Sequence, residues 1–240
     1  MSKFLLPIIF LITTLLSSNA KEISKKEEYV VVLHGIARSS DNMKELASFL
    51  GKNGYEVINI DYPSTSHKIE ELTDIVNLEM SKKIVDQKKI NFVGYSMGGL
   101  IVRALIHKFK YKNLGRVVQL APPNQGSEVA DFLKDFWPYK KIYGPAGQQL
   151  ITNQKDFDNI FGIVNYELGI IAGNSSIDPI SSFIIKGDDD GKVAIEKTKL
   201  EGMKDHIIID ASHTFFPTNK KVQKQALFFL KNGKFQHQTP

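Results

Sequence analysis

The 240-residue sequence predicts an α/β fold in which helices cover both faces of a mostly parallel central sheet. Two observations carry this prediction. Short, continuously apolar runs have the composition of strands that are buried on both faces. Segments with apolar residues at helical spacing follow these runs in alternation. Hydrophobic residues make up 42% of the chain, which is typical of a globular protein and not of a disordered one.

The first half of the chain alternates between expected strands and helices. Residues 30–33 are apolar and mostly β-branched, as in a buried parallel strand. Asp41 is a predicted N-cap for a helix over 43–50, because apolar residues recur there on one face. A strand over 55–60 ends at a turn that contains a proline, and the apolar spacing over 69–80 predicts the next helix.

The second half continues the same pattern. A strand over 90–95 runs directly into an amphipathic helix over 97–105, and another strand follows at 117–120. Residues 124–165 carry many aromatic side chains and are expected to be irregular. The remaining expected elements are strands at 168–172 and 207–209 and a helix at 223–230.

The first twenty residues predict a secretory signal peptide. Lys3 precedes an apolar run over 4–16, and Ser18-Asn19-Ala20 supplies the small residues of a cleavage site. An uncleaved membrane anchor is the alternative, but this run is shorter than the roughly 20 residues that a spanning helix needs. We therefore expect cleavage after Ala20, export to the periplasm or the medium, and a single mature domain over 21–240.

The composition excludes several classes of function. The chain has no cysteine, which rules out disulfides, thiolate metal sites and a cysteine nucleophile. The net charge is +5, but the lysines are dispersed and no arginine-rich or aromatic-basic motif is present. We therefore expect no nucleic-acid partner, while contact with an anionic membrane surface stays open.

Gly94-Tyr95-Ser96-Met97-Gly98 matches the pattern G-x-S-x-G. The bare pattern is weak, but here a predicted strand leads into it and a predicted helix leads out. This is the strand–turn–helix context of the nucleophile elbow in the α/β-hydrolase fold, in which Gly94 and Gly98 relieve crowding at a sharp turn. The alternative is an ordinary glycine-rich turn. The context predicts that Ser96 is a nucleophile.

His34-Gly35 ends the first strong strand. In the α/β-hydrolase fold, the loop after such a strand supplies one backbone donor to an oxyanion hole, and the residue after the nucleophile supplies the other. The predicted donors are the N–H groups of Ile36 and Met97, with His34 and Gly35 supporting the loop. The alternative is that His34 and Gly35 merely end a strand.

A serine nucleophile needs a base, and His213 is the predicted one. It follows the last expected strand at its carboxyl end, where the active sites of parallel sheets lie. The other five histidines belong to the oxyanion loop, an exposed helix face, the opposite sheet edge or polar segments: His34, His107, His206, His67 and His237.

The orienting acid is expected between the serine and the histidine in chain order. Asp188-Asp189-Asp190 lies in that interval, and Asp190 is favoured because Gly191 allows a tight turn directly behind it. Asp188 and Asp189 would then be solvated turn residues. A cation site or a wholly solvated turn is the alternative for the cluster.

Four motifs together resemble bacterial lipase-type α/β-hydrolases: His34-Gly35, Gly94-Tyr95-Ser96-Met97-Gly98-Gly99, Asp190-Gly191-Lys192-Val193 and Ser212-His213-Thr214-Phe215. Residues 144–150 and 171–174 also resemble one subgroup of these proteins. The resemblance covers nearly all of the mature chain. It implies a serine hydrolase with Ser96, Asp190 and His213 as its catalytic triad, and that family's motif places the acid immediately before the glycine.

These residues predict an esterase- or lipase-like enzyme that cleaves carboxylic esters through an acyl-enzyme, without a metal or organic cofactor. The expected substrate is a small-molecule or lipid ester. Acyl transfer or amide cleavage by the same triad, or a catalytically silent binding module, are the alternatives. Five aromatic residues either form a lid or acyl-chain wall or pack a helix onto the domain: Phe132, Phe136, Trp137, Tyr139 and Tyr143.

Overall fold

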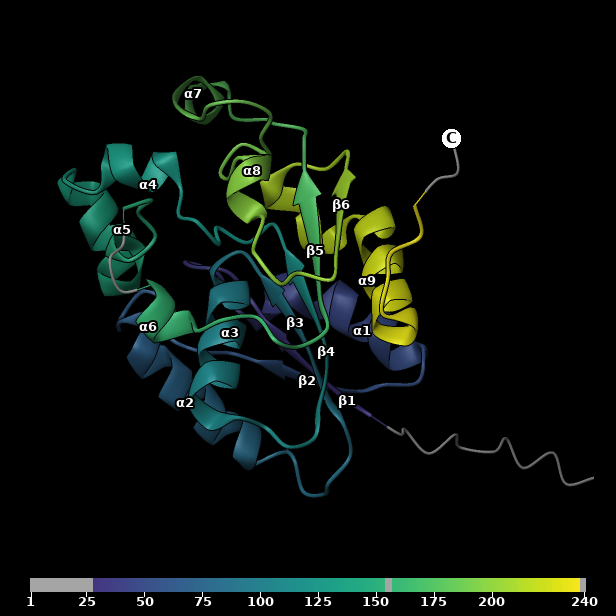
Figure 1. Cartoon of the computed structure of the whole chain (residues 1–240). Helices are drawn as coiled ribbons and strands as arrows, with labels where there is room; N and C mark the ends of the chain where they lie inside the picture. The colour runs from purple at the N-terminus through teal and green to yellow at the C-terminus, as the bar shows by residue number, and fades with distance from the viewer. Residues whose placement is uncertain (1–27, 154–156, 238–240) are drawn as a thin grey trace, which may run out of the picture.

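The computed structural model describes residues 28–153 and 157–237, so the predicted signal peptide lies outside the described residues (Figure 1). Within those ranges, six parallel strands form one sheet in the order β2-β1-β3-β4-β5-β6. The strands are β1 Tyr29–Leu33, β2 Glu56–Ile60, β3 Ile90–Tyr95, β4 Leu114–Leu120, β5 Leu168–Gly173 and β6 Asp205–Ile209. The predicted parallel α/β architecture is confirmed, with β4 and β6 starting earlier than expected.

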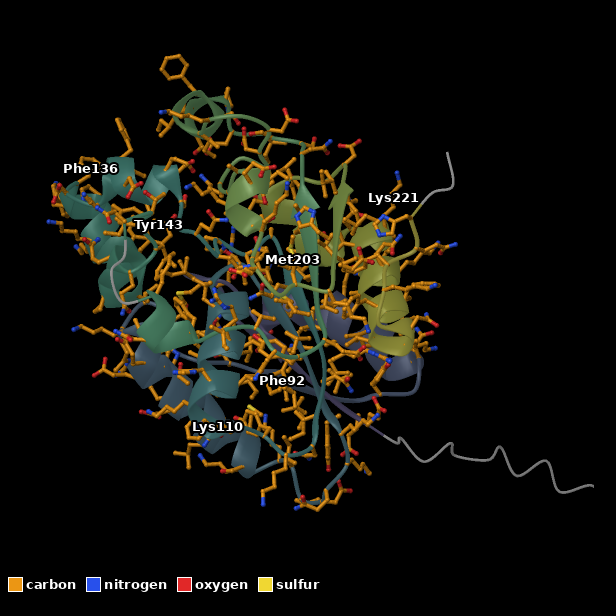
Figure 2. All side chains as sticks on the ribbon, viewed as in Figure 1. Phe92, Lys110, Phe136, Tyr143, Met203 and Lys221 are labelled. Atoms are coloured by element: carbon orange, nitrogen blue, oxygen red, sulfur yellow. The ribbon has the colours of Figure 1, made fainter. Side chains whose placement is uncertain are left out.

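Helices cover both faces of this sheet (Figure 1). One face packs against α1 Lys44–Lys52 and α9 Lys220–Asn232, and the other against α2 Ile69–Ser81 and α3 Met97–Phe109. Because side chains alternate along a strand, Val30 of β1 lies in the first core and Val31 in the second. Phe92 of β3, labelled in Figure 2, belongs to the core beneath α2 and α3.

The predicted capping role of Asp41 is wrong. A 3₁₀ turn, Ser40–Met43, precedes α1, and Asp41 lies inside this turn with its carboxylate 2.7 Å from the Lys44 ammonium group. The Ser40 N–H instead donates to the Asp61 carboxylate at 2.8 Å. This bond ties the chain that leads into α1 to the end of β2, and the helix begins two residues later than a cap at Asp41 would require.

The expectation of an irregular segment at 124–165 is also wrong. It contains α4 Glu128–Leu133, α5 Trp137–Gln148 and α6 Phe157–Phe161. Gly144 breaks α5 with a φ of 58° and a ψ of −157°, and a Cβ there would collide with the Thr65 carbonyl oxygen. Such short and interrupted helices leave little periodic signal in a sequence.

Two further helices were not predicted: α7 Pro179–Ile184 and α8 Ile195–Thr198. Figure 1 shows α7 beyond the carboxyl ends of β5 and β6 and α8 beside the end of β5, with α4 and α5 to one side. These elements border the sheet edge at which the candidate site lies. Among the described residues, no helix is both long enough and apolar enough to cross a bilayer.

Candidate active site

Ser96 lies in the turn between β3 and α3, as the sequence predicts. Its backbone has a φ of 53° and a ψ of −125°, a conformation that non-glycine residues rarely adopt. The turn is held from both sides, because the Ser96 N–H donates to the Leu120 carbonyl at 2.8 Å and the Ser96 carbonyl accepts from the Gly99 N–H at 2.9 Å. Local strain that is held in place in this way is frequent at functional sites.

Gly94 and Gly98 have no room for a side chain. A Cβ on Gly94 would lie 2.6 Å from the Gly98 carbonyl oxygen, and one on Gly98 would lie 2.5 Å from the His34 carbonyl oxygen. Any larger residue would push α3 away from β1 and β3. The two glycines therefore set the close approach that lets the turn hold Ser96 at the carboxyl edge of the sheet.

The structure brings Ser96, His213 and Asp190 together in one hydrogen-bonded row. The His213 Nε2 atom lies 3.1 Å from the Ser96 Oγ, and the His213 Nδ1 atom lies 2.7 Å from the Asp190 Oδ2. A carboxylate can only accept, so Nδ1 carries the proton and Nε2 presents its lone pair to the serine hydroxyl. This tautomer is the one that can remove the hydroxyl proton.

The Asp190 carboxylate is fixed by further contacts. Its Oδ1 accepts hydrogen bonds from the N–H groups of Lys192 at 3.0 Å and Val193 at 2.9 Å, while Oδ2 faces His213. The Asp190 carbonyl accepts from the His213 N–H at 2.8 Å. Only 2% of Asp190 is exposed, so these partners replace water around the charge.

Asp189 corrects one expectation. Asp188 is exposed as predicted, but Asp189 is buried and is not a solvated turn residue. Its Oδ1 accepts from the Gly191 N–H at 2.6 Å and from the Ser182 hydroxyl at 2.8 Å. Asp189 therefore ties the turn behind Asp190, where Gly191 has a φ of 95°, to α7.

Tyr95 is a neighbour of the site that the sequence analysis missed. Its hydroxyl donates to the His213 backbone carbonyl at 2.7 Å, and the two rings lie 5.3 Å apart. Burial raises the pKa of Tyr95, so the hydroxyl stays protonated as a donor. The only sequence signal was a tyrosine at the end of a buried strand, since a buried hydroxyl needs a partner somewhere in the fold.

His34 holds the loop after β1. It is fully buried, and desolvation lowers its pKa, so the ring is neutral. Nδ1 bonds the Gly35 carbonyl at 2.8 Å, and Nε2 accepts from the Tyr62 N–H at 3.3 Å. The Tyr62 ring stacks on the imidazole at 4.0 Å, and its hydroxyl bonds the His34 carbonyl. His34 thus has a structural role beneath the predicted oxyanion loop.

The predicted oxyanion donors come from two segments next to the serine. Ile36 and Gly35 line the same cavity as Ser96. Met97 is the first residue of α3, and the first N–H groups of a helix have no acceptor within that helix. A Cβ on Gly35 would lie 3.2 Å from the Ser96 Cβ, which shows how closely this loop approaches the nucleophile turn.

A cavity of about 310 Å³ opens beside Ser96 and His213. Side chains of α4, α5 and the residues after them form its apolar wall: Val129, Ala130, Leu133, Tyr139, Tyr143 and Leu150. The five aromatic residues therefore divide between two environments. Tyr139 and Tyr143 line the cavity, whereas Phe132, Phe136 and Trp137 are exposed. In Figure 2, Phe136 is labelled at the outer edge of the molecule and Tyr143 nearer its centre.

All six histidines lie in the described ranges, and the cavity lining includes His213 alone among them. His107 is exposed on α3, as predicted. His206 lies at the amino end of β6, where its Nε2 contacts the Thr198 hydroxyl at 3.0 Å. Over residues 28–153 and 157–237, no group of three or more histidine or carboxylate side chains could hold a metal ion.

Comparison with known families gives an independent result. Residues 29–161, more than half of the chain, match the family described as palmitoyl protein thioesterase. A lysosomal thioesterase PPT2 homolog of Drosophila melanogaster is 26% identical over 153 residues, which cover 57% of this chain and 52% of that protein. The chain thus matches about half the length of this curated relative. Both comparisons concern proteins that carry thioesterase in their names.

Solved structures agree on the fold. The mature lipase BlEst2 of Bacillus licheniformis superposes with a TM-score of 0.66 at 22% identity, over 87% of this chain and 92% of that one. Phospholipase PlaB of Legionella pneumophila superposes with a TM-score of 0.70 at 13% identity, over 86% of this chain and 60% of that one. The metagenomic carboxyl esterase MGS0156 superposes with a TM-score of 0.66 at 14% identity, over 88% of this chain and 76% of that one. The α/β-hydrolase fold and the resemblance to lipase-type proteins are confirmed.

Proposed function

This chain belongs to the palmitoyl protein thioesterase family, and from that premise we propose that it hydrolyses acyl esters or thioesters through Ser96. The observation that carries the proposal is the hydrogen-bonded row of Ser96, His213 and Asp190 beside an apolar cavity. Esters and thioesters share one reaction, in which a hydroxyl attacks an acyl carbonyl. The name of the family favours a thioester as the substrate. The proposed substrates therefore include thioesters as well as the carboxylic esters predicted from the sequence.

In the proposed reaction, His213 Nε2 takes the Ser96 hydroxyl proton while Oγ bonds to the carbonyl carbon. The carbonyl oxygen becomes an oxyanion held by the N–H groups of Ile36 and Met97, each of which contributes about 3 kcal/mol. Asp190 stabilises the imidazolium. Nε2 then gives its proton to the leaving alcohol or thiol. Water releases the acyl group by the same steps and restores the serine hydroxyl.

The cavity wall supports an acyl chain as the part of the substrate that binds beside Ser96. Tyr139 and Leu133 contribute apolar surface to one wall of the cavity, and an apolar wall suits an uncharged chain. Acyl transfer to an alcohol or amine, or amide cleavage, would use the same residues. Product analysis with competing acceptors separates these reactions from hydrolysis.

Labelling with a fluorophosphonate probe tests the central step. The probe should modify Ser96 and no other serine, and Ser96→Ala should abolish both labelling and hydrolysis while the fold is retained. Ser127→Ala is the matched control, because Ser127 also lines the cavity but donates its hydroxyl to the Lys192 carbonyl. Undiminished hydrolysis by Ser96→Ala would refute the serine mechanism.

Contact with a lipid surface is a further part of the proposal. The outer face of α4 meets α7 in an apolar groove lined by Phe132, Pro179, Ile180, Phe183 and Ile184. Phe132 is 68% exposed and Phe183 is 93% exposed, which is unusual for phenylalanine in water. Leu133, the next residue of the same helix, lines the catalytic cavity, so α4 contributes to both the groove and the cavity.

Sedimentation with phosphatidylcholine vesicles tests this contact. Phe132→Ser and Phe183→Ser should each weaken binding to the vesicles severalfold, because each removes exposed apolar surface. The matched control is Val85→Ser, since Val85 is 83% exposed and lies between α2 and β3, away from the groove. Equal binding by wild type and both phenylalanine variants would contradict the lipid contact.

Export is proposed on the sequence of residues 1–20 alone. Protein recovered from the periplasm or medium of a bacterial host should begin at Lys21, as measured by intact mass or N-terminal sequencing. Retention of Met1 on the recovered protein would favour the membrane anchor instead.

A further inference from the structure

Only three of the 31 basic residues are arginines, and two of these are bound within the fold. Arg103 is 4% exposed and donates to the Gly162 carbonyl. Arg116 pairs with Glu167 at 2.7 Å. Arg38 differs from both, because it is exposed and lines the catalytic cavity.

Arg38 and His213 line the same cavity. The proposed reaction has His213 protonate the leaving atom, so the leaving group lies on the His213 side of Ser96. Burial raises the pKa of the Tyr95 hydroxyl, and the positive charge of Arg38 lowers it. That hydroxyl donates to the His213 carbonyl, and Arg38 and His213 line one cavity, so an anionic group on the leaving part of the substrate can reach Arg38. The apolar wall of α4 and α5 is left for the acyl chain.

Arg38 differs from Lys192, which also lines the cavity, in having no carboxylate partner among the described residues. The Lys192 ammonium group lies 2.7 Å from the Asp178 carboxylate and is therefore paired. Among the described residues, no carboxylate lies within 4.0 Å of the Arg38 guanidinium. An exposed lysine would serve solubility equally well, whereas a guanidinium presents a planar fork of donors that fits phosphate and carboxylate groups.

We propose that Arg38 binds a phosphate or carboxylate group on the leaving part of the substrate, so that the enzyme prefers acyl esters or thioesters of an anionic alcohol or thiol. The inference rests on the proposed acyl hydrolysis and names the substrate class of that site. The acyl chain lies against Tyr139 and Leu133, and the anionic group faces Arg38. Arg38 is thus a specificity-determining residue and takes no part in bond making or breaking.

A pair of matched thioesters tests this directly. Octanoyl thioesters of 3-mercaptopropionate and 3-mercaptopropionamide differ only in a carboxylate against a carboxamide, and the thioester of 2-mercaptoethyl phosphate supplies the phosphate. The readout is the ratio of kcat/KM for each anionic thioester to that for the neutral one. We expect this ratio to fall at least about fivefold in Arg38→Ala, with Arg38→Lys intermediate and Arg38→Glu lower still. The anion with the larger loss identifies the preferred group.

Lys224→Ala is the control for net charge, because Lys224 is exposed on α9 and does not line the cavity. It should leave the ratio at the wild-type value, and added salt should lower the wild-type ratio. An unchanged ratio in Arg38→Ala, with both thioesters still hydrolysed, would overturn the inference and leave the proposed function standing. Failure of wild type to hydrolyse any of the thioesters would overturn both together.

Discussion

Replacement of Asp190 by asparagine tests the proposed triad most sharply. The asparagine side chain would keep the shape of the carboxylate and one acceptor oxygen, which would face the N–H groups of Lys192 and Val193 where Oδ1 now lies. The amide NH₂ group would then face His213 Nδ1 and donate to it. His213 would carry its proton on Nε2 and could no longer accept the Ser96 hydroxyl proton.

The expected loss is large. The same exchange of an orienting aspartate in a serine protease triad lowers kcat by about 10⁴, and we expect a similar loss here because Asp190 makes the same Nδ1 contact at 2.7 Å. At about 1.36 kcal/mol per tenfold change, it corresponds to roughly 5.4 kcal/mol of activation free energy. Stability should change little, since both amide contacts of Oδ1 are retained.

The neighbouring aspartates supply controls that fail in different ways. Asp188→Asn alters an exposed carboxylate and should leave kcat within about twofold, or roughly 0.4 kcal/mol. Asp189→Ala removes the acceptor of the Gly191 N–H, which lies at 2.6 Å, and a buried N–H left without a partner costs about 1–3 kcal/mol of unfolding free energy. Its kcat should fall far less than that of Asp190→Asn.

Steady-state hydrolysis of a soluble ester and denaturant unfolding separate these effects. We expect Asp190→Asn to lose turnover, Asp189→Ala to lose stability, and Asp188→Asn to lose neither. If Asp190→Asn keeps kcat within about tenfold of wild type, or roughly 1.4 kcal/mol, while another variant of the three is inactive, the orienting acid has been assigned wrongly.

Three further predictions concern groups around the site. The kcat/KM should fall on acidification, because a protonated His213 cannot act as base, and a flat profile down to about pH 5 would argue against His213. Tyr95→Phe removes the donor to the His213 carbonyl and should lower kcat about tenfold with an unchanged circular dichroism spectrum, whereas an unaltered kcat would refute a positioning role for the hydroxyl. Burial lowers the pKa of His34 and His206, so the unfolded chain takes up protons first, near the usual pKa of about 6.5. The unfolding free energy should therefore be highest above that pH. As the pH drops from there toward the lower pKa values of the folded state, each of the two histidines should reduce it by up to about 1.4 kcal/mol per pH unit. Urea unfolding at about pH 7 and about pH 5.5, on either side of the usual histidine pKa, measures this, and equal stabilities would contradict it.

Three of the site residues that were predicted from the sequence follow strands closely, whereas Asp190 was predicted from its chain order and from Gly191 behind it. Ser96 comes immediately after β3, His34 immediately after β1, and His213 four residues after β6. The carboxyl ends of parallel strands meet at one edge of the sheet, so a position in the chain translates into a position in space. The contact between Ser96 and His213 therefore follows from chain order and strand ends.

Contacts between side chains of separate loops could not be predicted in this way. Asp189 differs from Asp188 in being buried, with the Ser182 hydroxyl of α7 and the Gly191 N–H bonded to its carboxylate. Tyr95 contacts His213 over a separation of 118 residues. No periodicity or motif encodes such contacts, because they depend on how loops of different lengths fold back over the sheet.

The error over residues 124–165 has a physical cause that also bears on function. A helix is recognised in a sequence by one apolar and one polar face. In α4, Leu133 faces the cavity and Phe132 faces the outer groove, and in α5, Tyr143 lines the cavity while Trp137 is exposed. Apolar side chains on both faces erase the amphipathic pattern that would have identified these helices. The same distribution supplies apolar surface to the cavity wall and to the groove between α4 and α7. The amphipathic pattern of a helix is therefore lost in the part of the fold that is proposed to receive the acyl chain.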